Sequence, residues 1–129
     1  MFGGNTALFD AVAETVRLAD KDKLEDERVL VLVMTDGQEN SSRETTREQV
    51  QAIIAERTAR GSYTFAYIGE NPDRWARETG TSVRNTTHYN HADPRASFDI
   101  ARRATTAYRQ SDEVQSQSLI DQDPDKKDA

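Results

Sequence analysis

Two short polar segments combine residue types that could do chemistry, and each borders a predicted helix or strand. Gly3-Gly4-Asn5-Thr6 precedes a predicted helix, and Thr35-Asp36-Gly37 follows an apolar run. A carboxylate at the end of a strand, such as that of Asp36, could serve as a phosphate acceptor or as a metal-dependent nucleophile. The alternative without chemistry is that Thr6 only caps a helix and Asp36 only forms a turn.

The apolar run before Asp36 predicts how the carboxylate is positioned. Val29 to Met34 is a continuous run of six apolar residues, which is typical of a strand buried on both faces in a parallel sheet. Open α/β sheets bind ligands beyond the carboxyl ends of their strands, where Asp36 would lie. The helix predicted from Thr6 to Asp20 starts at the same edge, so both polar segments are expected there.

The rest of the chain alternates helices and strands. After the first strand, the pattern predicts a helix from the capping box Thr45–Glu48 to Gly61, a strand over 63–68, a helix over 72–79, a weak strand over 85–89 and a helix over 94–108. Alternation of this kind implies right-handed crossovers and a mostly parallel sheet. The predicted fold class is therefore α/β.

Composition predicts one modest domain with a polar extension. The chain has 129 residues, 35% of them hydrophobic, a mean hydropathy of -0.86 and a net charge of -6. Residues 110–129 hold six acidic groups and two lysines, and so contribute -4 of that charge. We expect residues 1–109 to fold and residues 110–129 to form a disordered acidic tail that is dispensable for folding, with Leu119-Ile120 as its only apolar pair.

The same composition excludes several classes of partner and compartment. The acidic balance and the lack of a clustered basic face argue against nucleic acid. No apolar run approaches the ~18 residues of a membrane span, and no basic segment precedes an apolar one as in an export signal. Cysteine is absent, which fits a reducing compartment. We therefore expect a cytoplasmic protein with no membrane partner.

Three segments together resemble a known family. The segments 3–12 and 33–37 are similar to parts of the von Willebrand factor A (vWA) domain, with bacterial and phage members the nearer likeness. The similarity continues through Phe65–Asn71, ends at the final helix, and covers residues 2–109. It implies a doubly wound, Rossmann-like fold. This chain would form part of it, with about three mostly parallel strands and flanking helices.

The resemblance also implies a metal site. In vWA domains Mg²⁺ is held by an Asp-x-Ser-x-Ser segment after the first strand, by a Thr before a helix and by an Asp after a later strand. The matching positions here are Thr6 and Asp36, with Asp36 often acting through water in the family. Mg²⁺ prefers oxygen ligands and keeps several waters. A site with few carboxylates can then recruit an Asp or Glu of a protein partner.

The sequence departs from the family pattern at one essential point. No Asp-x-Ser-x-Ser precedes the threonine loop, so the chain looks like the C-terminal part of such a domain. We therefore expect weak or no Mg²⁺ binding by this chain alone. The expected function is a non-enzymatic protein-interaction module without catalytic residues. The alternatives are a metal-dependent phospho-acceptor or hydrolase-type enzyme using Asp36, and a fragment without independent function.

The missing segment also affects the first strand. Later strands can cover one edge of Val29 to Met34, but in the vWA family the strand at the other edge comes from the absent part. The run contains no charge, proline or bulge of the kind that protects natural sheet edges. We therefore expect self-association, aggregation, or dependence on a complementing N-terminal fragment.

Overall fold

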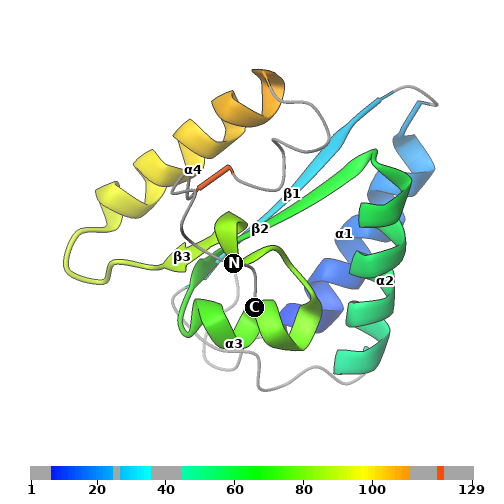
Figure 1. The fold of residues 1–129 in the computed structure, drawn as a ribbon, viewed down its shortest axis with the longest axis horizontal. Coiled ribbons are helices and arrows are strands. Elements are labelled where there is room, and N and C mark those ends of the chain that lie inside the picture. The colour runs from blue at the N-terminus through cyan, green and yellow to red at the C-terminus, as the bar shows by residue number, and fades with distance from the viewer. Residues whose placement is uncertain (1–6, 25–26, 36–44, 111–118, 121–129) are drawn as a thin grey trace.

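The computed structural model describes residues 7–24, 27–35, 45–110 and 119–120 (Figure 1). Within them the chain forms four α-helices, three strands and one short 3₁₀ helix. In chain order these are α1 (Leu8–Asp22), β1 (Val29–Met34), α2 (Arg47–Arg60), β2 (Tyr63–Gly69), α3 (Pro72–Thr79), η1 (Val83–Asn85), β3 (Thr86–His88) and α4 (Pro94–Gln110).

The three strands form one parallel sheet in the order β1-β2-β3. Val29 to Met34 pair with Tyr63 to Ile68, and Tyr67 to Gly69 pair with Thr86 to His88. The parallel pairing confirms the predicted α/β class with its Rossmann-like arrangement. Because β1, β2 and β3 follow one another across the sheet, right-handed crossovers require α2 and α3 to lie on the same face.

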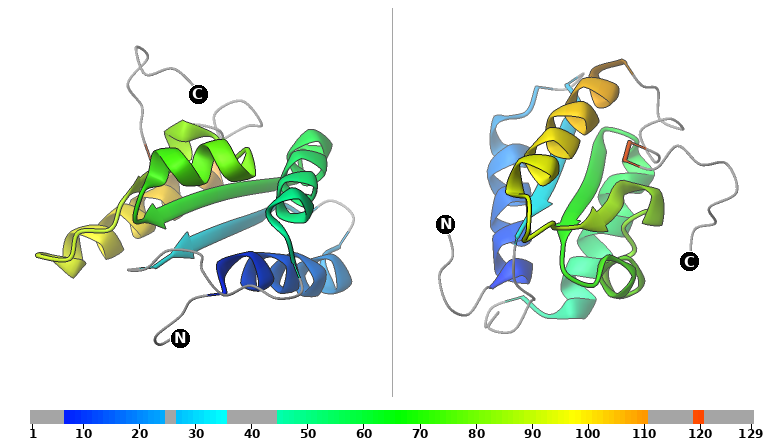
Figure 2. Two further views of the ribbon diagram at one scale, coloured as in Figure 1. Left: turned by 90° about the horizontal axis from the view of Figure 1, so that it is seen from below. Right: turned by 90° about the vertical axis from the view of Figure 1, so that its left-hand side faces the viewer.

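The helices cover the two faces unequally (Figure 2). The larger core lies on the face of α1, α2 and α3, and joins Val12, Val31, Ile54, Phe65 and Trp75 with their neighbours. On the other face α4 packs through Ala104 and Tyr108 near Leu30 of β1. After β3 the chain thus crosses back over the sheet to its first strand.

The start of α2 differs by one residue from the predicted capping box. The N-cap is Thr46, whose side chain accepts a hydrogen bond from the Gln49 amide at 3.1 Å, while Gln49 Oε1 accepts one from the Thr46 amide at 2.8 Å. The prediction of a box from Thr45 to Glu48 is wrong, because the Thr45 amide donates to Asp10 instead. Gly61 ends the helix in the left-handed conformation, as predicted.

Burial distinguishes the two long strands. All seven residues of β2 are buried, whereas in β1 only Val31 is buried and the other five residues are half-buried. The prediction that β1 is covered on both faces is therefore wrong for most of its length. The reason is its position, since among the described strands β1 has a neighbour on one side only.

The predicted tail contains one pair of residues that docks on the body. Leu119 is buried in a small cluster with Ala104 and Tyr108, and Ile120 packs beside it. The Leu119 amide donates to Asn85 Oδ1 at 2.6 Å. The expectation of a segment without ordered contacts is wrong for these two residues, while residues 111–118 and 121–129 lie outside the described part of the chain.

Candidate functional site

The described residues next to the two predicted polar segments lie at the carboxyl edge of the sheet. Thr6 and Asp36 themselves lie outside the described residues. Helix α1 begins at Leu8 with Ala7 as its N-cap, so the alternative that Thr6 caps this helix is wrong. Thr35, the residue before Asp36, extends the ladder of β1, because its amide donates to the Ile68 carbonyl at 2.9 Å.

A hydrogen bond at this edge connects the first turn of α1 to Thr45. Asp10, in the first turn of α1, accepts a hydrogen bond from the Thr45 amide at 2.8 Å through Oδ1. Asp10 lies four residues after Thr6, and Thr45 follows directly after residues 36–44. The contact therefore holds the chain beyond the Asp36 segment against the helix that follows the Thr6 segment.

The end of β2 lies beside the end of β1. A Cβ atom built on Gly69 would approach the Tyr67 hydroxyl oxygen to 2.4 Å and Thr35 Cγ2 to 2.9 Å, so only glycine fits there without rearrangement. The Tyr67 hydroxyl donates to the Glu70 carbonyl at 2.7 Å. Burial raises the pKa of Tyr67 to about 12, which keeps this donor protonated. Asn71 then starts α3 in a left-handed conformation with φ 48°.

Two titratable side chains near this edge were not predicted as a pair. Glu70 follows β2, and its Oε1 lies 3.6 Å from Nε2 of His91, which is exposed beside Tyr89. His88 is the exposed last residue of β3. No group of three metal-ligating side chains occurs among the described residues. Sequence spacing could not reveal the Glu70–His91 pair, because these residues come from different loops.

An open groove follows the free edge of β1. It has a volume of about 670 Å³ and is lined by β1 itself, by α1, by Tyr89 and by Phe98 of α4. Leu8, Ala11, Val12 and Thr15 form the α1 wall, and Tyr89 and Phe98 form the opposite one. Phe98 is 59% exposed although it is a large apolar residue. The groove lies along the edge of β1 that has no neighbour among the described strands.

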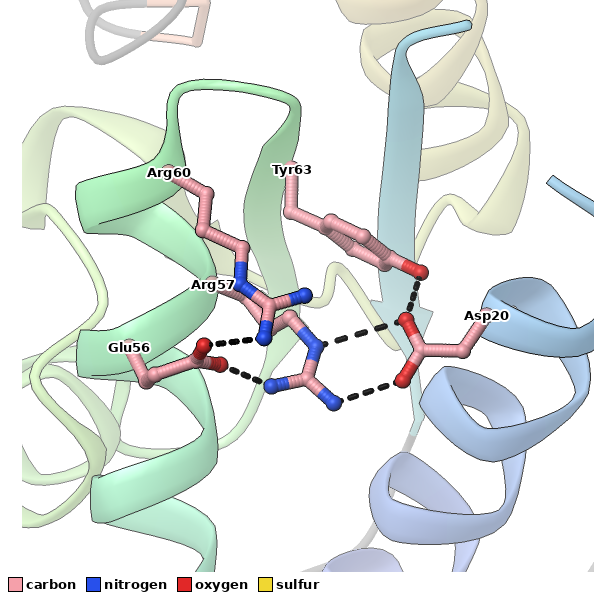
Figure 3. A network of polar contacts seen from close by, with 5 residues as sticks. All are labelled: Asp20, Glu56, Arg57, Arg60 and Tyr63. Carbon is pink, nitrogen blue, oxygen red and sulfur yellow. Dashed lines mark hydrogen bonds and ion pairs between the residues drawn. The ribbon is translucent and has the colours of Figure 1, made fainter. Parts of the chain in front are cut away.

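A polar network occupies the opposite, amino-terminal end of β2 (Figure 3). Asp20 at the end of α1 accepts from Arg57 of α2, with Nη2–Oδ2 at 2.5 Å, and from the Tyr63 hydroxyl. Glu56 pairs with both Arg57 and Arg60. Hydrogen bonds from Arg57 and Tyr63 lower the pKa of Asp20, and burial raises that of Tyr63 to about 12. Each of these charges has a partner, so the network joins α1, α2 and β2 and lies far from the carboxyl edge.

Two aromatic residues, Trp75 and Tyr108, have packing roles. Trp75 stacks on Tyr67 with ring centroids 4.5 Å apart and also contacts Phe9 at 6.0 Å. Tyr108 of α4 is buried, with the Arg28 guanidinium 4.3 Å from its ring centre. Glu39 and Asn40, which follow Asp36, lie outside the described residues.

Comparisons with known proteins do not identify a relative. No family model, no curated protein and no solved structure matches this chain. Within the described part of the chain, every helix is too short or too polar to cross a lipid bilayer. The fold class is therefore established by the sheet and helices themselves.

Proposed function

We propose that this chain is a non-enzymatic protein-interaction module of the vWA type. In this proposal Thr6 and Asp36 supply two oxygen ligands to a Mg²⁺ site at the carboxyl edge of the sheet. The remaining ligands come from a segment outside this sequence. The bound ion then recruits a carboxylate of a protein partner, because a site with few anionic ligands leaves Mg²⁺ able to accept another one.

The observation that carries the proposal is the hydrogen bond from the Thr45 amide to Asp10. It fixes the region after residue 44 to the first turn of α1, and the adjacent β1 ends at Met34. The described residues on either side of 36–44, Thr35 and Thr45, thus lie at the edge at which α1 begins. Parallel α/β sheets bind ligands at this edge, which supports a shared role for the two polar segments.

The first experiment is a calorimetric titration of the isolated chain with Mg²⁺. Two oxygen donors cannot replace the hydration shell that this ion gives up reluctantly, so we expect no saturable micromolar site. A version extended at its N-terminus by a strand and an Asp-x-Ser-x-Ser segment should bind the ion. In that version Asp36→Ala should weaken binding by roughly tenfold or more, and the exposed control Asp22→Ala should not.

Two results would contradict the proposal. A micromolar Mg²⁺ site in the isolated chain would mean that this chain completes the site by itself. Unchanged Mg²⁺ affinity of the extended Asp36→Ala variant would remove Asp36 from the ligand set.

The enzymatic alternative makes a different prediction. A phospho-acceptor Asp36 would form an acyl phosphate when the chain is incubated with acetyl phosphate and Mg²⁺. We expect no label on the wild-type protein. Stable labelling that disappears in Asp36→Asn would overturn the non-enzymatic proposal and establish the carboxylate as a nucleophile.

A further inference from the structure

We propose that an arginine-lined hollow between α2 and α3 binds a phosphoryl group. The hollow uses neither of the two residues proposed as Mg²⁺ ligands, and its test needs no metal ion. The inference therefore goes beyond the proposed function and does not depend on it.

The hollow lies where α2 and α3 pack against each other (Figure 1). Val50 and Ile54 of α2 and Trp75 of α3 turn inward and join the core. Residues three or four apart share one side of a helix, so the outer sides of the two helices each present a group of polar side chains. The hollow has a volume of about 470 Å³. Its lining is entirely polar and consists of Arg47, Glu48 and Gln51 from α2 and Arg74, Arg77 and Glu78 from α3.

The lining carries an excess of positive charge. Three arginines and two glutamates give the hollow a net charge of +1, in a chain whose net charge is -6. Each guanidinium also has more N–H donors than one carboxylate can accept. The lining therefore has donors and charge left over for an anionic ligand.

Glu78 gathers two of the arginines around one anionic oxygen. Its Oε1 lies 3.1 Å from Nε of Arg74 on the same helix and 3.8 Å from Nη1 of Arg47 on α2. The side chain of Glu78 is 25% exposed, whereas the side chains of Arg47 and Arg74 are 54% and 52% exposed. The two guanidiniums are thus held close together and remain accessible to a ligand.

Arg77 adds a third guanidinium that is not engaged. Its side chain is exposed, and no hydrogen bond or ion pair joins it to another described residue. It lies three residues after Arg74, on the same side of α3. A ligand in the hollow would be the first partner of this charge within the described part of the chain.

Three guanidiniums from two helices suit a phosphoryl group better than a carboxylate. A phosphoryl group carries up to about two negative charges and several acceptor oxygens, and arginine pairs with it through parallel N–H···O bonds. A carboxylate is matched by a single arginine. The lining offers no aromatic or apolar side chain on which a nucleoside base could stack. Recognition therefore rests on the phosphoryl group itself, supplied as a free phosphate or on a phosphorylated side chain of another protein.

The test is an NMR titration of the full-length chain in metal-free buffer, followed at the Nε–Hε signals of the arginines. The first probe is inorganic phosphate, with chloride at the same ionic strength as the reference. The signals of Arg47, Arg74 and Arg77 should shift together and saturate with phosphate but not with chloride. A peptide with one phosphoserine, compared with the same peptide carrying serine, then identifies the source. Tighter binding of the phosphopeptide than of inorganic phosphate assigns the group to a protein, and equal binding assigns it to the free anion.

Matched variants separate a specific site from general attraction of anions. Arg77→Gln should weaken phosphate binding by roughly tenfold, because it removes a charged donor. Arg95→Gln makes the same change of charge at an exposed arginine of α4 and should leave the affinity nearly unchanged. Glu48→Gln removes a competing negative charge from the lining and should strengthen binding by roughly threefold.

Three outcomes would overturn the proposal. The absence of saturable shifts with both phosphate and the phosphopeptide would mean that the hollow is an ordinary group of surface ion pairs. Saturation by chloride at the same concentrations would show that the hollow does not distinguish a phosphoryl group. Equal weakening in Arg77→Gln and Arg95→Gln would mean that phosphate responds only to the net charge of the protein.

Discussion

The backbone amide of Leu119 donates a hydrogen bond of 2.6 Å to the side-chain oxygen of the buried residue Asn85. The amide group of Asn85 in turn donates to the Phe65 carbonyl of β2 at 3.3 Å. One buried side chain therefore connects the C-terminal segment to the central strand. The Ile120 amide adds a second contact by donating to the Arg84 carbonyl at 3.2 Å.

Replacing Leu119 by alanine should lower the free energy of unfolding by about 2 kcal/mol, because a buried leucine is removed from its cluster with Ala104 and Tyr108. Urea denaturation followed by circular dichroism measures the change. The control is Leu24→Ala, at a leucine that is 65% exposed, where little change is expected.

Two truncations extend this test. A chain that ends after Ile120 should keep the thermal midpoint of the full chain, and a chain that ends after Gln110 should not. Equal midpoints for the two truncations would mean that Leu119 and Ile120 add nothing to the stability of the body.

The contact between Asp10 and Thr45 predicts a difference between two substitutions. Asp10→Ala leaves the Thr45 amide without its acceptor and should cost about 1.5 kcal/mol in unfolding free energy. Asp10→Asn keeps the Oδ1 acceptor and should lose less than half of that. If both variants are as stable as the wild type in urea denaturation, the contact does not anchor the segment after residue 44.

The Asp20 network predicts a pH-dependent stability. Its hydrogen bonds with Arg57 and Tyr63 hold the pKa of Asp20 below its ordinary value of 3.8, so the folded state favours the ionised carboxylate. This stabilisation is present above pH ~4 and is lost as the pH falls through the lowered pKa of the folded state. At pH 7 Asp20→Asn should lower the unfolding free energy by about 1 kcal/mol.

The difference between wild type and Asp20→Asn should shrink toward zero when unfolding is measured at pH 3 and below. Asp22→Asn, in the last turn of the same helix, serves as the control and should change little at either pH. A difference that stays constant from pH 7 to acid would show that the charge of Asp20 is not what stabilises the network.

Gly69 allows a close approach at the ends of β1 and β2. An alanine there would place its methyl group 2.4 Å from the Tyr67 hydroxyl oxygen, and Tyr67 is held by its stack on Trp75. Gly69→Ala should therefore lower the unfolding free energy by about 2 kcal/mol, since a buried aromatic ring must move. Gly80→Ala is the contrast. Its added methyl group meets no atom within 4 Å, and only the left-handed backbone conformation, with φ 81°, disfavours an alanine there. Tyr67 hydroxyl and ring signals in NMR should shift in Gly69→Ala and remain in place in Gly80→Ala.

Local patterns predicted much of the fold. The run Val29–Met34, the cap at Gly61 and Pro72 at the start of α3 each determine their structure from nearby residues, and all three occur as predicted. The alternation of helices and strands gave the parallel sheet because right-handed crossovers leave few other arrangements.

The remaining features depend on contacts between distant residues. Nothing near Leu119 in the sequence indicates that it docks, because its acceptor belongs to Asn85, 34 residues earlier. The register of the cap at Thr46 depends in the same way on Asp10, which engages the Thr45 amide from 35 residues away. The side-by-side position of Glu70 and His91 likewise follows from the sheet and could not be read from spacing.

The central claim is that the Thr6 and Asp36 segments form one cation-binding edge, and paramagnetic Mn²⁺, used in place of Mg²⁺, tests it most directly. In NMR spectra of the isolated chain, low Mn²⁺ concentrations should broaden the amide signals of Leu8, Thr35 and Thr45 together, even though binding is weak. The effect at these three amides should be lost in Asp36→Asn and kept in Asp22→Asn. Broadening at Leu8, Thr35 and Thr45 that is the same in Asp36→Asn as in the wild type would contradict the claim.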